Sequence, residues 1–256
     1  MKRILKIALG LNNLRKIYNI GELFKLSLKG LDLQFINKLE AKRTLVLSPH
    51  PDDEIFGMAG TLALLENSVI TVLYLCDGGS GTKNGTYSQT LASKRYQETR
   101  TSAKILGLDK LIFWKIKDGK LSANKKTIKN LNNLLEQLKP EIIFLPHLFD
   151  NHPDHFATGE ILAKALKIKK RLKLEIWGYE IWSPTFINRL VDISKTWKIK
   201  EKAILAHKTQ LQCRDYLQAI KGLNSYRAKN LNKGNLAEGF LYLPCEVYLK
   251  IHRKFL

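Results

Sequence analysis

From residue 44 onward, short apolar runs alternate with longer stretches in which apolar residues recur at helical spacing. The runs are rich in β-branched and aromatic residues, which is typical of buried strands, and they cover 44–48 (TLVLS), 69–75, 110–116, 141–146 and 173–180. The helical stretches lie near 55–67, 88–107, 125–138 and 156–168. The pattern predicts an α/β fold, a Rossmann-like three-layer α/β/α arrangement with a mostly parallel sheet and the active site at the carboxyl ends of its strands.

The remainder of the chain gives weaker patterns. Residues 198–221 have helical texture, and 239–251 (GFLYLPCEVYLKI) predict one or two closing strands. The glycine-rich stretch 77–86 predicts a loop. No repeat or low-complexity segment interrupts this pattern.

Residues 1–43 differ in character from the rest. Apolar residues recur there at helical spacing, with basic and polar residues between them: Ile4, Ile7, Leu11, Leu14 and Ile17. We therefore expect a basic amphipathic extension over 1–43 and a single domain over 44–256. Two hypotheses follow for the extension, a helix docked on its own domain or a contact with an anionic membrane surface.

The chain carries 43 Lys and Arg against 23 Asp and Glu, a formal net charge of +20 at pH 7. This balance favours anionic partners, or it reflects a solvated lysine-rich surface. No Arg/aromatic nucleic-acid motif is present, so no specific nucleic-acid partner is expected.

Cysteine usage and apolar run lengths indicate the compartment. The three cysteines form no CxxC pair, and no segment offers the 18 or more apolar residues that a spanning helix needs. We expect a cytoplasmic protein, with a peripheral position on the inner face of the membrane as the alternative.

Acids and histidines concentrate in two boxes, SPHPDDE (48–54) and DNHPDHF (150–156), each directly after a predicted strand. His50 and Asp53 are three residues apart at the start of a helix, and His155 can join them from the other loop. Two imidazoles and one carboxylate leave positions open for water, as in catalytic zinc sites, and the same ligands suit Fe²⁺. Either box alone could be an ordinary polar helix start, but their joint position favours a metal site.

The boxes PHPDDE and HPDH resemble those of the LmbE-like or PIG-L family of zinc-dependent N-deacetylases. The similarity extends from about Thr44 to Gln210 and includes RYQETRTSAKILGL (95–108) and AHKTQ (206–210). The resemblance implies that His50, Asp53 and His155 hold the metal and that Asp52 is the general base. It further implies that His152 is a cationic acid and oxyanion partner, which Asp154 orients.

Outside the boxes, the resemblance implies substrate-binding roles for Arg95 and His207. Glu54 either stabilises the helix N-terminus or fixes a ligand through a hydrogen bond. The expected reaction is removal of an acetyl group from an N-acetylated sugar, free, lipid-linked or nucleotide-linked, with Zn²⁺ and Fe²⁺ as candidate cofactors. The alternatives are an amidase for a non-sugar or thiol-sugar amide, and a polyanion-binding protein on a degenerate enzyme fold.

Overall fold

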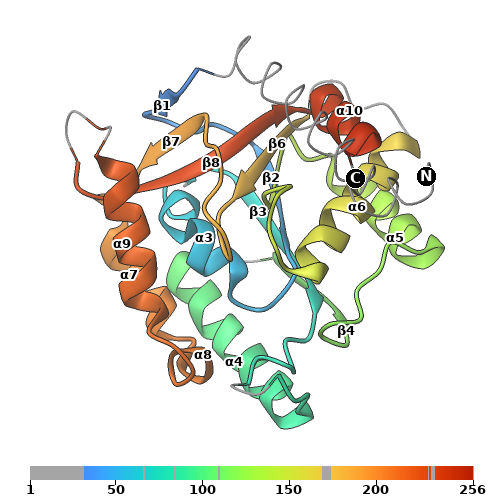
Figure 1. Ribbon diagram of the computed structural model, residues 1–256, viewed down its shortest axis with the longest axis horizontal. Coiled ribbons are helices and arrows are strands. Elements are labelled where there is room, and N and C mark those ends of the chain that lie inside the picture. The colour runs from blue at the N-terminus through green and yellow to red at the C-terminus, as the bar shows by residue number, and fades with distance from the viewer. Residues whose placement is uncertain are drawn as a thin grey trace, which may run out of the picture.

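The computed structural model describes residues 32–65, 67–82, 85–108, 110–168, 174–229, 231 and 234–255. Within these residues, eight strands form one sheet (Figure 1). In chain order they are β1 (Gln34–Ile36), β2 (Arg43–Ser48), β3 (Val69–Cys76), β4 (Lys110–Ile116), β5 (Ile142–Pro146), β6 (Glu175–Tyr179), β7 (Arg189–Asp192) and β8 (Ala237–Pro244). The helices are α3 (Asp53–Leu62), α4 (Gln89–Leu106), α5 (Lys125–Leu138), α6 (Pro153–Ile168), α7 (Trp197–Leu205), α8 (Lys208–Leu211), α9 (Tyr216–Ala228) and α10 (Cys245–Phe255).

The strand order is β1-β7-β8-β6-β5-β2-β3-β4. Among the described strands only β8 runs antiparallel to its neighbours, so the prediction of a mostly parallel sheet is confirmed. From β2 the chain winds outward through β3 and β4, whereas from β5 it winds the other way to β6. The reversal lies between β2 and β5, where open α/β sheets bind their ligands beyond the carboxyl ends of the strands.

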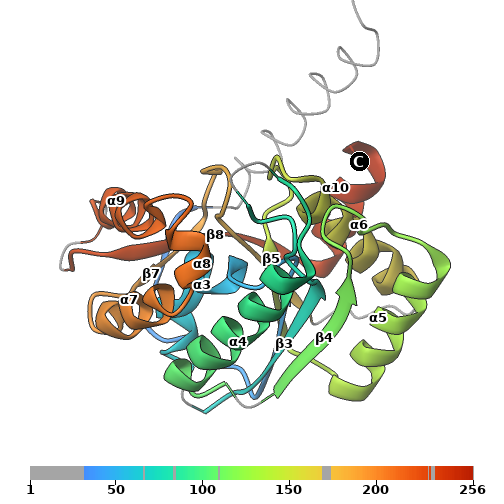
Figure 2. The ribbon, with the colours of Figure 1, turned by 90° about the horizontal axis from the view of Figure 1, so that it is seen from below.

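Helices cover both faces of the sheet, with α5, α6 and α10 on one side and α3, α4 and α7 on the other (Figures 1 and 2). The alternation of side chains along the inner strands separates the two cores. In β2, Leu45 and Leu47 pack into the core under α5 and α6, whereas Val46 packs into the core under α3 and α4. Both faces of β2 are therefore buried, which explains its continuous apolar sequence.

Most predicted strands and helices occur within a few residues of the predicted bounds, but the C-terminal prediction is partly wrong. Only 237–244 form a strand, and CEVYLKI begins α10, with Cys245, Tyr248 and Ile251 buried at helical spacing. That short stretch also alternates apolar and polar residues, so its sequence fits either period. Strand β7 falls in a segment for which no strand was predicted.

Residues 1–31, which hold most of the predicted extension, lie outside the described residues. Within 32–43, Gln34–Ile36 form β1 and pair in parallel with β7. Part of the range 1–43 therefore belongs to the sheet. No helix among the described residues is both long and apolar enough to cross a membrane.

Candidate functional site

Both boxes lie beyond the carboxyl ends of β2 and β5, the two strands that flank the reversal of winding. The first box forms the turn between β2 and α3, and the second leads from β5 into α6. Parallel pairing of β2 with β5 places both turns at the same edge of the sheet. The fold thus brings together segments about a hundred residues apart in the chain, namely His50 and Asp154.

A buried hydrogen-bond network connects the first box to β2 and β3. The Glu54 side chain is fully buried and accepts hydrogen bonds from the Tyr74 hydroxyl (2.5 Å) and the Ser48 hydroxyl (2.7 Å). Ser48 Oγ also lies 2.6 Å from the His50 carbonyl oxygen. Burial raises the pKa of Glu54 to about 7 in spite of these hydrogen bonds. Glu54 also lies in the first turn of α3, so its position is compatible with both predicted roles.

The three predicted metal ligands meet at the Asp53 carboxylate. Asp53 Oδ2 lies 3.2 Å from His50 Nδ1 and 3.2 Å from His155 Nε2, and it accepts a hydrogen bond from the His50 backbone N–H at 2.8 Å. All three side chains are buried. The two ring nitrogens therefore approach the same carboxylate oxygen from different elements.

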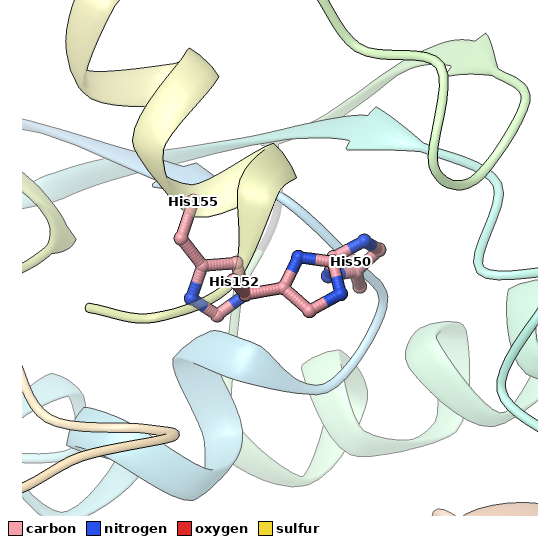
Figure 3. Close-up of side chains that lie close together, drawn as sticks. All are labelled: His50, His152 and His155. Atoms are coloured by element: carbon pink, nitrogen blue, oxygen red, sulfur yellow. The ribbon is translucent and has the colours of Figure 1, made fainter. Parts of the chain in front are cut away.

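The donor set fits a metal ion. His155 is fully buried, yet neither of its ring nitrogens has a hydrogen-bond partner of suitable geometry, although carboxylates lie within ion-pair distance. Nitrogen atoms of His50, His152 and His155 lie within 4.8 Å of one another, and Figure 3 shows these three rings grouped together. A second group with the same spacing joins His50, Cys76 and Asp154. Buried imidazole nitrogens without donors or acceptors are what a bound cation would satisfy.

Carboxylates surround the histidines and set their charge. Burial lowers the pKa of His50, but Asp118, Asp154 and Asp53 together raise it well above its ordinary value. Burial likewise lowers the pKa of His155, and Asp53 and Asp150 raise it to about 9. The pKa of Asp53 lies well below its usual range because the two imidazoles outweigh burial. The site is therefore built to hold positive charge.

Sequence reasoning missed two of these carboxylates and gave a third a different contact. Asp118 Oδ1 lies 3.3 Å from His50 Nε2, and Asp150 Oδ1 lies 3.2 Å from His155 Nδ1. The Asp154 carboxylate, predicted to orient His152, instead lies 3.0 Å from His50 Nε2. Asp118 follows β4 and Asp150 precedes HPDH, so position at the sheet edge was the available signal. Carboxylates behind metal-binding histidines commonly fix ring orientation.

The His152 ring is held by a hydrogen bond from the backbone of a nearby residue. Its Nδ1 accepts a hydrogen bond from the Asp154 backbone N–H (3.2 Å), which leaves Nε2 as the protonated nitrogen of a neutral ring. Burial and the nearby rings of His50 and His155 lower the pKa of His152. The cationic state predicted for this ring is thus disfavoured in the structure, whereas a neutral N–H donor is favoured.

Arg95 reaches the first box from α4. Its side chain is 4% exposed. Nη2 lies 2.7 Å from Asp52 Oδ1 and donates to the Pro51 carbonyl oxygen at 2.6 Å, and Nη1 donates to the Gly78 carbonyl oxygen at 2.9 Å. Gly78 has φ 69°, and a Cβ there would lie 2.7 Å from Nη1, so this position requires glycine. Asp52 itself has φ 136°, a strained conformation that the Arg95 contacts help to hold.

His207, the other predicted substrate-binding residue, is fully buried and does not line the cavity described below. Its Nε2 lies 3.0 Å from Ser102 Oγ on α4, and burial together with Arg95 lowers its pKa to about 3. Thr209 donates to Glu98 of α4 through both its backbone N–H (2.8 Å) and its hydroxyl (2.6 Å). The RYQET and AHKTQ segments therefore pack against each other, and their contacts join α8 to α4.

The cluster opens into a cavity of about 1120 Å³. His50, Asp52, Asp53, Arg95 and His152 all contribute to its lining, as do Asp118 and Gln210. Burial raises the pKa of Asp52 to about 7, and the charge of Arg95 opposes that rise. A carboxylate, a candidate metal site and an imidazole N–H thus face one space, which is the arrangement needed to hydrolyse an amide.

Comparison with known proteins agrees with this geometry. The profile described as GlcNAc-PI de-N-acetylase (PIG-L) matches residues 45–166. The chain is 29% identical over 211 residues to a diacetylchitobiose deacetylase from Thermococcus kodakarensis, covering 75% of this chain and 79% of the relative. It is 30% identical over 190 residues to a probable N-acetyl-α-D-glucosaminyl L-malate deacetylase 2 from Bacillus subtilis, covering 67% of this chain and 84% of the relative.

Among solved structures, the chain is similar to an N,N'-diacetylchitobiose deacetylase from Pyrococcus horikoshii. The TM-score is 0.74 at 25% identity, over 89% of this chain and 94% of that one. The matched profile spans both boxes, and the relatives extend the match beyond it. The chain therefore belongs to the GlcNAc-PI de-N-acetylase (PIG-L) family.

Proposed function

We propose that the protein is a zinc-dependent N-deacetylase that hydrolyses the acetamide group of an N-acetylated sugar. The observation that carries the proposal is the convergence of His50, Asp53 and His155 beside Asp52 and His152, all at the edge of one large cavity. Family membership and the names of the relatives, which are deacetylases of N-acetylated sugars, support the reaction class.

His50, Asp53 and His155 would hold the ion through the Asp53 carboxylate and the two ring nitrogens that lie 3.2 Å from it, His50 Nδ1 and His155 Nε2. When bound, a divalent ion there supplies Lewis-acid chemistry, acidifying water and polarising the amide carbonyl. Asp118 and Asp154 would fix the His50 ring, and Asp150 that of His155. Zinc suits this donor set, and ferrous iron is the alternative to be tested.

Asp52 would accept the proton of the attacking water, because its carboxylate lines the cavity and is not among the three atoms that face the ion site. Arg95 would keep that carboxylate in place. His152 would donate a hydrogen bond from its Nε2–H to the developing oxyanion, and the protonated Asp52 carboxyl would pass the proton taken from water to the departing amine.

The test is an acetate-release assay on N-acetylglucosamine derivatives with metal-depleted protein, reconstituted with zinc or ferrous iron. Asp53→Ala should lose metal and turnover together, because a ligand atom is deleted. Asp52→Asn should keep metal and lose turnover by about 10²-fold or more, the usual effect of removing a positioned general base.

Asp32→Asn is the matched control, since this exposed carboxylate lies outside the cavity, and it should behave like wild type. Turnover of thiol-sugar or non-sugar amides in place of N-acetylated sugars would replace the proposed substrate class. No acetate release with either metal, from protein that retains it, would refute the proposed reaction.

A further inference from the structure

The cavity extends well beyond the cluster of acids and histidines. Its volume of about 1120 Å³ exceeds the roughly 300–1,000 Å³ typical of small-molecule sites. One wall of the extension is a single stripe of α9, with Tyr216, Ala219, Ile220 and Leu223 at helical spacing. Ala219 is exposed and the other three are half-buried, Tyr216 and Ile220 by packing against the core, so the described part of the protein covers this stripe only in part.

The surface beside this stripe is also apolar. Phe56 of α3 and Ile181, which follows β6, line the cavity, and the Phe56 ring stacks on Tyr216 with centroids 5.0 Å apart, so the two rings form one continuous apolar surface. We call this space the apolar trough, and it is lined by Phe56, Ile181, Tyr216, Ala219, Ile220 and Leu223. Five of these side chains carry no hydrogen-bonding group at all, and Tyr216 carries one hydroxyl.

The apolar trough adjoins the reacting end of the cavity. Phe56 follows Asp53 by three residues in α3, so both lie on one face of that helix. Between the cluster and solvent, Trp182 is 48% exposed and stacks on His152 at 5.8 Å between centroids. A ligand bound at His152 would therefore lie beside the Trp182 indole, and Arg214, whose guanidinium carbon is 5.8 Å from the centroid of that ring, lines the same cavity.

We propose that the substrate carries an apolar aglycone, an alkyl or aryl group attached to the N-acetylated sugar, and that this group lies in the apolar trough. The inference rests on the proposed function. A second sugar would bring hydroxyls into a wall that offers almost no hydrogen-bond partners, which is unfavourable. A dicarboxylate would need cations, which the six side chains of the apolar trough do not include; Arg214 lines the cavity outside the trough. Alkyl groups require neither.

Binding is measured first, independently of turnover. Isothermal calorimetry compares the methyl and n-octyl β-glycosides of N-acetylglucosamine on the zinc-loaded full chain carrying Asp52→Asn, which is expected to keep metal without turnover, with the octyl compound below its critical micelle concentration. The octyl glycoside should bind about tenfold or more tightly and with a more negative heat-capacity change, the signature of apolar burial. Equal affinities would overturn the inference.

A pair of variants on α9 locates the effect. Ala219→Asp places a charge in the apolar trough, whereas Ser225→Asp places the same charge on an exposed position of the helix outside the cavity. Ala219→Asp should abolish the octyl preference, measured as the ratio of the two affinities. Ser225→Asp should keep the preference. Retention of the preference in both variants would overturn the inference.

Two further measurements, one of binding and one of acetate release, distinguish this inference from its alternatives. Tighter binding of N-octanoylglucosamine than of the octyl glycoside would place an apolar chain on the acyl side and would contradict an aglycone site. If acetate is released from both glycosides at equal kcat/KM, the proposed function stands and the apolar-aglycone inference fails. If the octyl glycoside binds selectively and no metal restores acetate release, the apolar binding site stands and the proposed deacetylase function fails.

Discussion

At the scale of single residues, Arg95 is the side chain on which the geometry of Asp52 depends. Asp52 is buried in a strained conformation, and its carboxylate lies 2.7 Å from Arg95 Nη2. Arginine can contact this carboxylate and two carbonyl oxygens at once because its guanidinium is a planar fork, which a lysine ammonium cannot reproduce. The predicted substrate-binding role and this positioning role lead to different kinetics.

We expect Arg95→Lys to lower kcat by about tenfold or more while KM changes little and metal content is kept, because the general base is misplaced. Steady-state kinetics with metal analysis measure this. Arg100→Lys, on an exposed position of the same helix, is the control and should match wild type. A raised KM with unchanged kcat would instead support substrate binding by Arg95.

His207 supplies a test of pH dependence. Its pKa is lowered to about 3 by burial and by Arg95, whereas an unfolded histidine has a pKa near 6.5. The unfolded chain therefore binds one more proton below pH 6.5. The stability from the neutral ring is fully present above that pH and is lost as the pH falls toward 3.

We expect the free energy of unfolding of wild type, relative to His207→Gln, to fall by about 1 kcal/mol between pH 6 and pH 5. Urea unfolding of both proteins at several pH values measures the difference, in which the titration of all other shared groups cancels. A difference independent of pH would show that His207 does not remain neutral in the folded protein.

At the scale of elements, a buried ion pair and the hydrogen bonds of its carboxylate link α7 and α3 to β8. Lys200 Nζ lies 2.6 Å from Glu238 Oε1, and both side chains are fully buried. Glu238 also accepts hydrogen bonds from the backbone N–H groups of Gly60 and Thr61 in α3. This contact holds the helix whose first turn carries the end of the PHPDDE box.

We expect Lys200→Met to lower the free energy of unfolding by about 3 kcal/mol or more, because it leaves a buried carboxylate without its cation. The double variant Lys200→Met/Glu238→Gln should recover part of the loss. Lys198→Met removes an exposed ion pair of the same helix, with Glu201 at 3.5 Å, and should change stability by less than about 1 kcal/mol. Equal losses in the two single variants, measured by urea unfolding, would contradict this account.

At the scale of the whole molecule, part of the net positive charge of the chain lies in its N-terminal segment. Residues 1–31 contain seven Lys and Arg and one Glu. Our hypothesis that this segment contacts an anionic membrane concerns residues outside the described structure. The structure nevertheless improves its test, since a truncation must spare β1 and should therefore begin at Asp32.

We expect the full chain to sediment with vesicles containing anionic lipid at low salt and the chain from Asp32 to remain in solution. Each basic residue near such a surface contributes about 1 kcal/mol, and added salt should release the protein. Neutral vesicles are the control. Equal binding by both chains would remove the N-terminal segment as the membrane contact.

The sequence by itself determined the α/β class and the two boxes. Buried parallel strands must be apolar on both faces, so runs such as 44–48 and 69–75 can be predicted as strands from the sequence alone. The two boxes can be recognised in the sequence because metal ligands and a general base need particular side chains at short spacing. In contrast, α10 and β7 were not foreseen, since short segments that alternate weakly fit more than one period.

Only the tertiary structure decided how the boxes are supported and what surrounds them. Asp118 and Asp150 reach the histidines because β4 and β5 end at the same edge of the sheet, a juxtaposition that sequence distance conceals. The burial of His207 and the contact of Asp154 with His50 likewise depend on packing between distant elements. The apolar trough exists because α9 lies against α3, and local sequence patterns carry no information about which helices become neighbours.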